Sequence, residues 1–260
     1  ATLLGALLVG DSVRHSLMRG SLARIGAVHN AMSSGDRFFQ ASLAERMQVP
    51  CAPVISMQAV GSSSTGDRRL HDIQVLGVES RFFELAPETS QIQSILAGEA
   101  WVNGTLAARL QLVAGEEVVL RVELPSALPR DMALAPGEVA VALRLRVAGV
   151  LDRGSFAEFG LYGGSSERPN VLVNLVWLQE QLQVPGAANL MLSPEVETET
   201  LNRALAQHWQ LEDAQLEVSS LADGRRELRT DRIFFDAPIL EKLEALGAAP
   251  LEGVFTYFVN

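Results

Sequence analysis

The sequence contains a single cysteine and a single lysine among its 260 residues. Because Cys51 has no partner, an intrachain disulfide is excluded, and a cysteine-based metal site lacks its other ligands. We expect Cys51 to be a small buried apolar residue just before a strand. Lys242 is the one lysine, so every other basic side chain, histidines apart, is an arginine.

Aromatic residues are also scarce, at 6 % of the chain, and no apolar run approaches the ~18 residues of a membrane-spanning helix. The apolar fraction of 48 % is still sufficient for a core, which we expect to be built from leucine, valine and alanine. A length of 260 residues fits one large domain or two of ordinary size.

The sequence has fewer basic than acidic residues. It contains 21 lysines and arginines and 31 aspartates and glutamates, which gives a formal net charge of −10. The isoelectric point is near 4.9. Nucleic acids and anionic lipid surfaces attract basic proteins. The balance therefore argues against nucleic acid as a partner and against polybasic docking on a membrane.

The first ten residues are uncharged and mostly apolar, and an amphipathic helix is predicted from Asp11 to Gly26. A membrane span needs about 20 apolar residues, so this stretch is about half of one. It also lacks the basic start and the cleavage site of a signal peptide. Two interpretations stay open: the outer half of a transmembrane helix, or an apolar core helix of a soluble protein.

Residues 27–90 have α/β character. The pattern predicts a strand over 27–33, a helix over 36–48, and a hairpin of two apolar strands, 53–60 and 70–78. The glycine- and serine-rich residues between those strands predict a solvated hairpin tip, because a phosphate-binding loop would need a following lysine and a helix.

Residues 91–186 are predicted to be mainly β. Asn103 is placed to cap a short helix that ends at Leu110. The strands expected here are 118–123, 139–151 and 171–175, with loops over 124–137 and 160–169 and a short helix over 177–182. Within 139–151, Leu143 and Leu145 alternate with Arg144 and Arg146, which is typical of a half-buried strand.

The last third, 187–260, returns to α/β character. Strands are predicted around Leu190, over 216–218 and over 254–259, and helices over 195–209 and 237–246, the latter with Pro238 in its first turn. The charged run 225–229 is interpreted as a solvated turn.

Two motifs near the start suggest enzymes and are incomplete. Residues Gly5 to Ser12 have the glycines and serine of a phosphate-binding loop, but Asp11 stands where that loop needs lysine. Gly10-Asp11-Ser12 resembles the nucleophile block of the Gly-Asp-Ser hydrolases. That chemistry needs a late histidine with an acidic partner; no histidine follows His208, and no aspartate lies three residues before it.

The four histidines, His15, His29, His71 and His208, are scattered and show no metal-ligand spacing. Neighbouring acidic residues such as Glu116 and Glu117 are interpreted as surface charges. We therefore assign no catalytic, cofactor-binding or metal-binding residue and expect no enzymatic activity and no cofactor.

The order of the predicted elements resembles the extracytoplasmic domain of MacB/FtsX-type ABC transporter permeases. The segments that carry the resemblance are Leu7-Leu-Val-Gly-Asp-Ser-Val13, Ser21-Leu-Ala-Arg-Ile-Gly26, Val75-Leu-Gly-Val-Glu-Ser-Arg-Phe-Phe83, Trp101-Val-Asn-Gly-Thr-Leu-Ala-Ala-Arg-Leu110, Val113-Ala-Gly-Glu-Glu117, Leu145-Arg-Val-Ala-Gly-Val-Leu151, Asn170-Val-Leu-Val-Asn174, Trp177-Leu-Gln-Glu180, Asp231-Arg-Ile-Phe-Phe235 and Thr256-Tyr-Phe-Val-Asn260. The last third is longer than in the compact exporter domains of this family.

The resemblance implies an α+β fold with three parts. These are a stalk helix leaving the membrane (1–26), a discontinuous α/β lobe (27–90 and 187–260) and an inserted, mainly β lobe (91–186). It also implies a periplasmic segment of an inner-membrane permease that couples cytoplasmic ATP hydrolysis to substrate export, lipoprotein release or signalling. The implied partners are the cytoplasmic ABC ATPase, a second copy or partner permease, and a periplasmic adaptor or lipoprotein. A secreted hydrolase using Ser12 and a non-catalytic binding or scaffold domain are the alternatives.

Overall fold

The computed structural model of this chain describes most of residues 24–230. The described ranges are 24–64, 66–86, 94–123, 140–151, 156–161, 167–221 and 223–230, together with Gly20, Leu22, Ile92 and Glu241. Four predictions lie outside them: most of the stalk helix over 1–26, the loop over 124–137, the helix over 237–246 (except Glu241) and the strand over 254–259. Within the described part of the chain, no helix is long and apolar enough to cross a bilayer.

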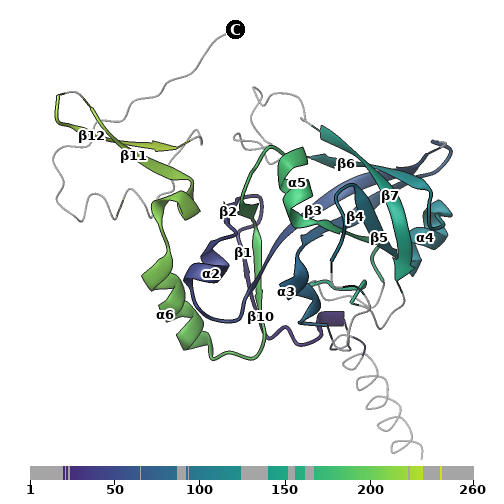
Figure 1. The fold of residues 1–260 in the computed structure, drawn as a ribbon, viewed down its shortest axis with the longest axis horizontal. Coiled ribbons are helices and arrows are strands. Elements are labelled where there is room, and N and C mark those ends of the chain that lie inside the picture. The colour runs from purple at the N-terminus through teal and green to yellow at the C-terminus, as the bar shows by residue number, and fades with distance from the viewer. Residues whose placement is uncertain are drawn as a thin grey trace, which may run out of the picture.

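The fold is α+β, with helices packed around a mixed sheet of eight strands in the order β1-β10-β3-β4-β8-β5-β7-β6 (Figure 1). The strands of this sheet are β1 (Asn30–Ser33), β3 (Ala52–Ser63), β4 (Arg69–Val78), β5 (Glu99–Asn103), β6 (Glu117–Glu123), β7 (Ala140–Leu151), β8 (Asn170–Asn174) and β10 (Leu190–Ser193). The short strands β2 (Phe39–Gln40) and β9 (Ala187–Ala188) pair with each other, as do β11 (Leu216–Ser220) and β12 (Arg226–Thr230). The helices are α2 (Leu43–Arg46), α3 (Ser80–Phe83), α4 (Gly104–Leu110), α5 (Leu175–Gln181), α6 (Thr198–His208) and the 3-10 helix η2 (Leu211–Ala214).

Six of the eight strands close into a ring, because β3 pairs with β6 as well as with β4. Strand β3 is 12 residues long, enough to pair with β10 through its first residues and with β4 and β6 through the rest. The β3–β4 register shifts between Ala59 and Gly61. A Cβ on Gly61 would overlap Ile73 Cδ1, so glycine permits the tight curvature at this point.

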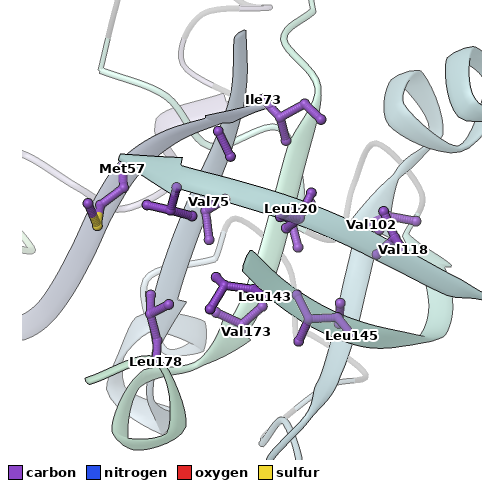
Figure 2. Close-up of a cluster of buried hydrophobic side chains, with 14 of the residues drawn as sticks. Met57, Ile73, Val75, Val102, Val118, Leu120, Leu143, Leu145, Val173 and Leu178 are labelled. Carbon is purple, nitrogen blue, oxygen red and sulfur yellow. The ribbon is translucent and has the colours of Figure 1, made fainter. Parts of the chain in front are cut away.

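The ring is filled by aliphatic side chains, which Figure 2 shows converging from opposite strands. On β7, Leu143 and Leu145 are buried inside the ring while Arg144 and Arg146 are exposed, which confirms the predicted alternation. Helices α4 and α5 add Leu106 and other leucines to the same cluster. At about 1.5–3 kcal/mol for each fully buried aliphatic side chain, this cluster is the main stabilising element of the ring.

A second buried cluster lies on the outer face of β3, β4 and β8, beneath helix α3 and residues 156–159. Three phenylalanines form its centre: the ring centroid of Phe82 lies 4.7 Å from that of Phe156 and 5.4 Å from that of Phe159. A cluster of packed phenylalanine rings therefore lies on the outside of the ring of strands.

A third cluster joins early and late parts of the chain, since helices α2 and α6 pack over β2, β9 and β10. Cys51 lies in this cluster, buried and directly before β3, as the sequence predicts. Burial raises the pKa of its thiol, although a hydrogen bond with Ser193 and the charge of Arg81 act in the opposite direction.

Two predicted elements are wrong. Residues 36–48 form strand β2 and the four-residue helix α2 in place of one helix, because Phe39 pairs with Ala188 and is buried there. Residues 226–230 form strand β12 in place of a turn. Leu228 pairs with Val218 on one face, whereas Glu227 and Arg229 lie on the other, so the charges do not oppose strand formation.

The other predicted elements that fall on described residues agree with the structure to within a few residues, whereas β5, β9, α3 and η2 were not predicted. The hairpin of β3 and β4, the strands β1, β6, β7, β8, β10 and β11, and the helices α4, α5 and α6 all lie where the pattern places them. The division into lobes at 91 and 186 stays a prediction. The ring nevertheless takes β3 and β4 from before residue 91 and β5 to β8 from after it.

Candidate functional site

The residues that suggested enzyme chemistry are not brought together in the described structure. Asp11, Ser12 and His15 lie outside the described residues. His29 is exposed, with its Nδ1 3.0 Å from the carbonyl oxygen of Ala27, His71 is exposed, and His208 ends α6. Among the described residues, no group of three or more histidine, cysteine or acidic side chains is placed to hold a metal ion.

The structure brings together a different set of residues, a buried polar row that crosses the main sheet. Its members are Asn189, Ser56, Gln74, Asn170 and Asn103, contributed by five successive parts of the sheet. All except Ser56 are at most 5 % exposed. A polar side chain buried this deeply destabilises the fold unless it is hydrogen-bonded, so the partners of each member define what the row does.

Asn189 lies just before β10. Its side chain makes the hydrogen bonds to β3 that the backbone of a neighbouring strand would otherwise make. Its Oδ1 accepts from the backbone N–H of Ser56 at 2.7 Å, and its Nδ2 donates to the carbonyl of the same residue at 2.9 Å. Nδ2 also donates to the carbonyl of Gly35 at 3.1 Å. The carboxamide therefore provides hydrogen-bond partners for the backbone N–H and C=O of β3 at the point where β3 leaves β10 and enters the ring.

Asn103 joins β5, α4 and β8. Its Oδ1 accepts from Leu106 N at 3.0 Å, which is the predicted helix cap, and from Asn170 N at 3.1 Å. Its Nδ2 donates to the carbonyl of Arg168 at 2.7 Å. Asn174 is an equivalent cap for α5, since its Oδ1 accepts from Trp177 N and its Nδ2 donates to the carbonyl of Ile95. Both asparagines thus fix a helix against the ring.

An ion pair holds the C-terminal part of the described structure to its N-terminal part. Arg46 Nη2 on α2 lies 2.5 Å from Asp213 Oδ2 on η2. The Asp213 side chain is fully buried and also accepts from Gln210 N at 2.8 Å. In Figure 1, η2 and the β11–β12 hairpin lie beyond α6, on the side of the molecule away from β6 and β7.

Sequence reasoning identified Asn103 and missed the other members of this arrangement. Gln74 interrupts the apolar run 73–78 of β4 and was available as a signal. Asn189 and Asp213 gave none, because their partners lie 133 and 167 residues away in the chain. The row contains amides and a hydroxyl, a chemistry suited to holding backbone in place rather than to nucleophilic or acid–base catalysis.

The fold is that of an α+β domain organised around a closed six-stranded sheet. The sequence matches no known protein-family profile and no curated protein. Among solved structures, the chain is similar to the periplasmic region of MacB from Actinobacillus actinomycetemcomitans, with 10 % identity and a TM-score of 0.41, over 86 % of this chain and 95 % of that one. It is also similar to the extracellular domain of the noncanonic ABC-type transporter YknZ from Gram-positive bacteria, with 12 % identity and a TM-score of 0.40, over 74 % and 91 % of the two chains.

The structure thus resembles extracytoplasmic domains of the MacB and YknZ type, the class that the sequence also resembles. At these identities and TM-scores the two similarities carry no conclusion about function. The function of the chain has to be inferred from its own residues and contacts.

Proposed function

We propose that this chain is the non-enzymatic extracytoplasmic domain of a MacB/FtsX-type ABC transporter permease. In this role it transmits movement, driven by ATP hydrolysis in the cytoplasm, to the face of the domain that meets cargo or a partner protein. Residues 1–26 would form the stalk that joins it to the membrane helices, and the domain would lie in the periplasm, attached to the inner membrane.

The observation that supports coupling is the continuity of the main sheet. Strand β1 begins at Asn30, a few residues after the predicted stalk, and pairs with β10 over four residues. Strand β10 pairs with β3, and β3 continues without a break into the six-stranded ring. A force applied at β1 therefore meets hydrogen-bonded strands all the way to the ring, with no flexible linker between.

The buried polar row supports the same role. Asn189 maintains pairing at the point where β3 passes from β10 into the ring, which is where an unsupported sheet would bend. Asn103 and Asn174 hold α4 and α5 in place. The partners implied by the proposal are a cytoplasmic ABC ATPase, reached through the membrane helices, a second copy or partner permease, and a periplasmic adaptor or lipoprotein. Nucleic acid is not among them.

The first test is to read the coding sequence on both sides of residues 1–260. About ten further apolar residues before Ala1 and additional membrane spans after Asn260 are expected. A cleavage site abutting Ala1, with no span after Asn260, would contradict the proposal and favour the secreted hydrolase or binding alternatives.

The second test measures coupling in the complete permease, reconstituted with its ATPase in proteoliposomes. The Asn189→Ala variant is expected to hydrolyse ATP at the parent's basal rate but to transport fewer substrate molecules per ATP. Asn202→Ala, at an exposed position on α6, is the matched control and should transport normally. Equal transport per ATP in all three proteins would show that the junction at Asn189 does not carry the movement.

A further inference from the structure

Two buried oxygen atoms of the polar row have no hydrogen-bond donor among the described residues. These are Gln74 Oε1 and Asn170 Oδ1, and their residues are 3 % and 2 % exposed. Buried acceptors are nearly always paired in folded proteins, and an unpaired one destabilises the native state. Two such atoms on adjacent strands therefore need an explanation.

The two side chains are neighbours on one face of the sheet. Gln74 on β4 is the register partner of Asn170 on β8, and the strands are parallel. The next residues, Val75 and Val171, both point into the ring, so Gln74 and Asn170 both point out of it. The backbone N–H of Gln74 donates to the carbonyl of Pro169 at 2.9 Å, which fixes the two strands at this level.

Both side chains also approach one segment of chain, residues 156–161. Asn170 Nδ2 donates to the carbonyls of Ala157 and Phe159 at 2.9 and 2.8 Å, so its Oδ1 is oriented away from them. The next residue, Gly160, carries no side chain, and a Cβ built there would lie 3.7 Å from Gln74 Oε1. Gln74 Nε2 donates in the opposite direction, to Ser56 Oγ on β3.

We infer that Gln74 Oε1 and Asn170 Oδ1 form a binding site for one buried water molecule, which donates a hydrogen to each of them beneath Gly160. A water molecule carries two donor hydrogens, matching the two free acceptors, and is small enough for a site without a side chain at 160. The site provides two neutral oxygens and no carboxylate, which is too few ligands and too little charge for a divalent cation. The bound water therefore joins β4 to β8.

A crystal structure of this chain at high resolution tests the site directly. We expect an ordered solvent peak within hydrogen-bond distance of both oxygens, unchanged when ammonium or potassium replaces sodium in the buffer. An empty site, a side chain donating to both oxygens, or a peak that strengthens with the cation concentration would overturn the inference.

Thermal unfolding of variants tests it independently. Gln74→Met preserves length but removes one acceptor, and should lower Tm by at least about 2–4 °C, the shift expected for the loss of one net hydrogen bond in a chain of this size. The matched control is Gln58→Met, at the exposed register partner of Gln74 on β3, and should leave Tm unchanged. A rise in Tm for Gln74→Met would contradict the inference, because it would mean that methionine relieves an unpaired acceptor.

The effect on Tm of losing the hydrogen bond from Gln74 to Ser56 must be distinguished from the effect of losing the water. Ser56→Ala removes only that bond and is expected to lower Tm by less than Gln74→Met does. An equal loss in the two variants would assign the effect to Ser56 and overturn the inference. If Gln74→Met does not fold, the crystal structure of the parent chain still decides the question.

Discussion

Arg46 and Asp213 form an ion pair whose acidic member is fully buried. Arg46 Nη2 lies 2.5 Å from Asp213 Oδ2, and the two side chains are 24 % and 0 % exposed. The pair joins α2, near the start of the described chain, to η2, near its end. Among the described residues, Arg46 Nε and Asp213 Oδ1 have no hydrogen-bond partner, and Arg46 is the cation that lies against the buried carboxylate.

Removal of the arginine should therefore be strongly destabilising. Arg46→Ala leaves the Asp213 carboxylate buried without a cation, and we expect the free energy of unfolding to fall by about 3 kcal/mol. Urea denaturation of the parent and the variant measures this difference. The matched control is Arg229→Ala, which breaks the exposed pair with Glu227 and should change stability by less than about 1 kcal/mol. Similar losses in the two variants would mean that Asp213 is not held as the structure describes.

Asn189 is expected to hold β3 at its passage into the ring. Asn189→Ala removes three hydrogen bonds to the backbone of Ser56 and Gly35 and should lower the free energy of unfolding by about 2–3 kcal/mol. The amide hydrogen of Ser56 should then exchange with solvent much faster. Hydrogen exchange followed by NMR or mass spectrometry measures this, with Asn202→Ala as the control. An unchanged exchange rate of the Ser56 amide hydrogen would contradict the proposal that the Asn189 carboxamide holds this part of β3.

Gly61 is expected to be required for closure of the ring. Gly61→Ala places a methyl group against Ile73 Cδ1 and, at 3.1 Å, against Leu120 Cδ2, and should destabilise by about 1–3 kcal/mol. Gly104→Ala is the matched control, because nothing lies within 4 Å of its Cβ position in the first turn of α4 and alanine favours a helix. Denaturant unfolding of both variants is the measurement. A Gly61→Ala variant as stable as the parent would show that the strands can separate there without loss.

Local patterns predicted the elements of this fold well. Alternating leucines and arginines identified β7, and Asn103 identified the start of α4, because in both cases the signal lies within a few residues of the structure it causes. The helix predicted over 36–48 failed because Phe39 is held by Ala188, a partner 149 residues away, which a local pattern does not reveal.

Closure of the sheet is a long-range property in the same sense. The pairing of Ala59 with Val122 joins strands that the sequence assigned to different lobes, and neither strand carries a local signal for it. The partners of Asn189 and Asp213 were hidden for the same reason. A polar residue within an apolar run, as at Gln74 in the run 73–78, shows only that a partner is needed, and not where the partner lies.

Cys51 gives a prediction about the dependence of stability on pH. Burial raises the pKa of its thiol above the ordinary value of 9.0, so the folded chain retains the proton at pH values where the unfolded chain releases it. Because the unfolded state then binds fewer protons, the free energy of unfolding falls as pH rises above about 9, and below that pH the group has no effect. Urea denaturation between pH 7 and 10 measures the fall, and in Cys51→Ala this part of it should disappear. The native thiol should also react slowly with a thiol reagent at pH 8, and rapidly once urea unfolds the chain. Rapid reaction in the folded state would contradict the burial of Cys51 among α2, α6 and β10.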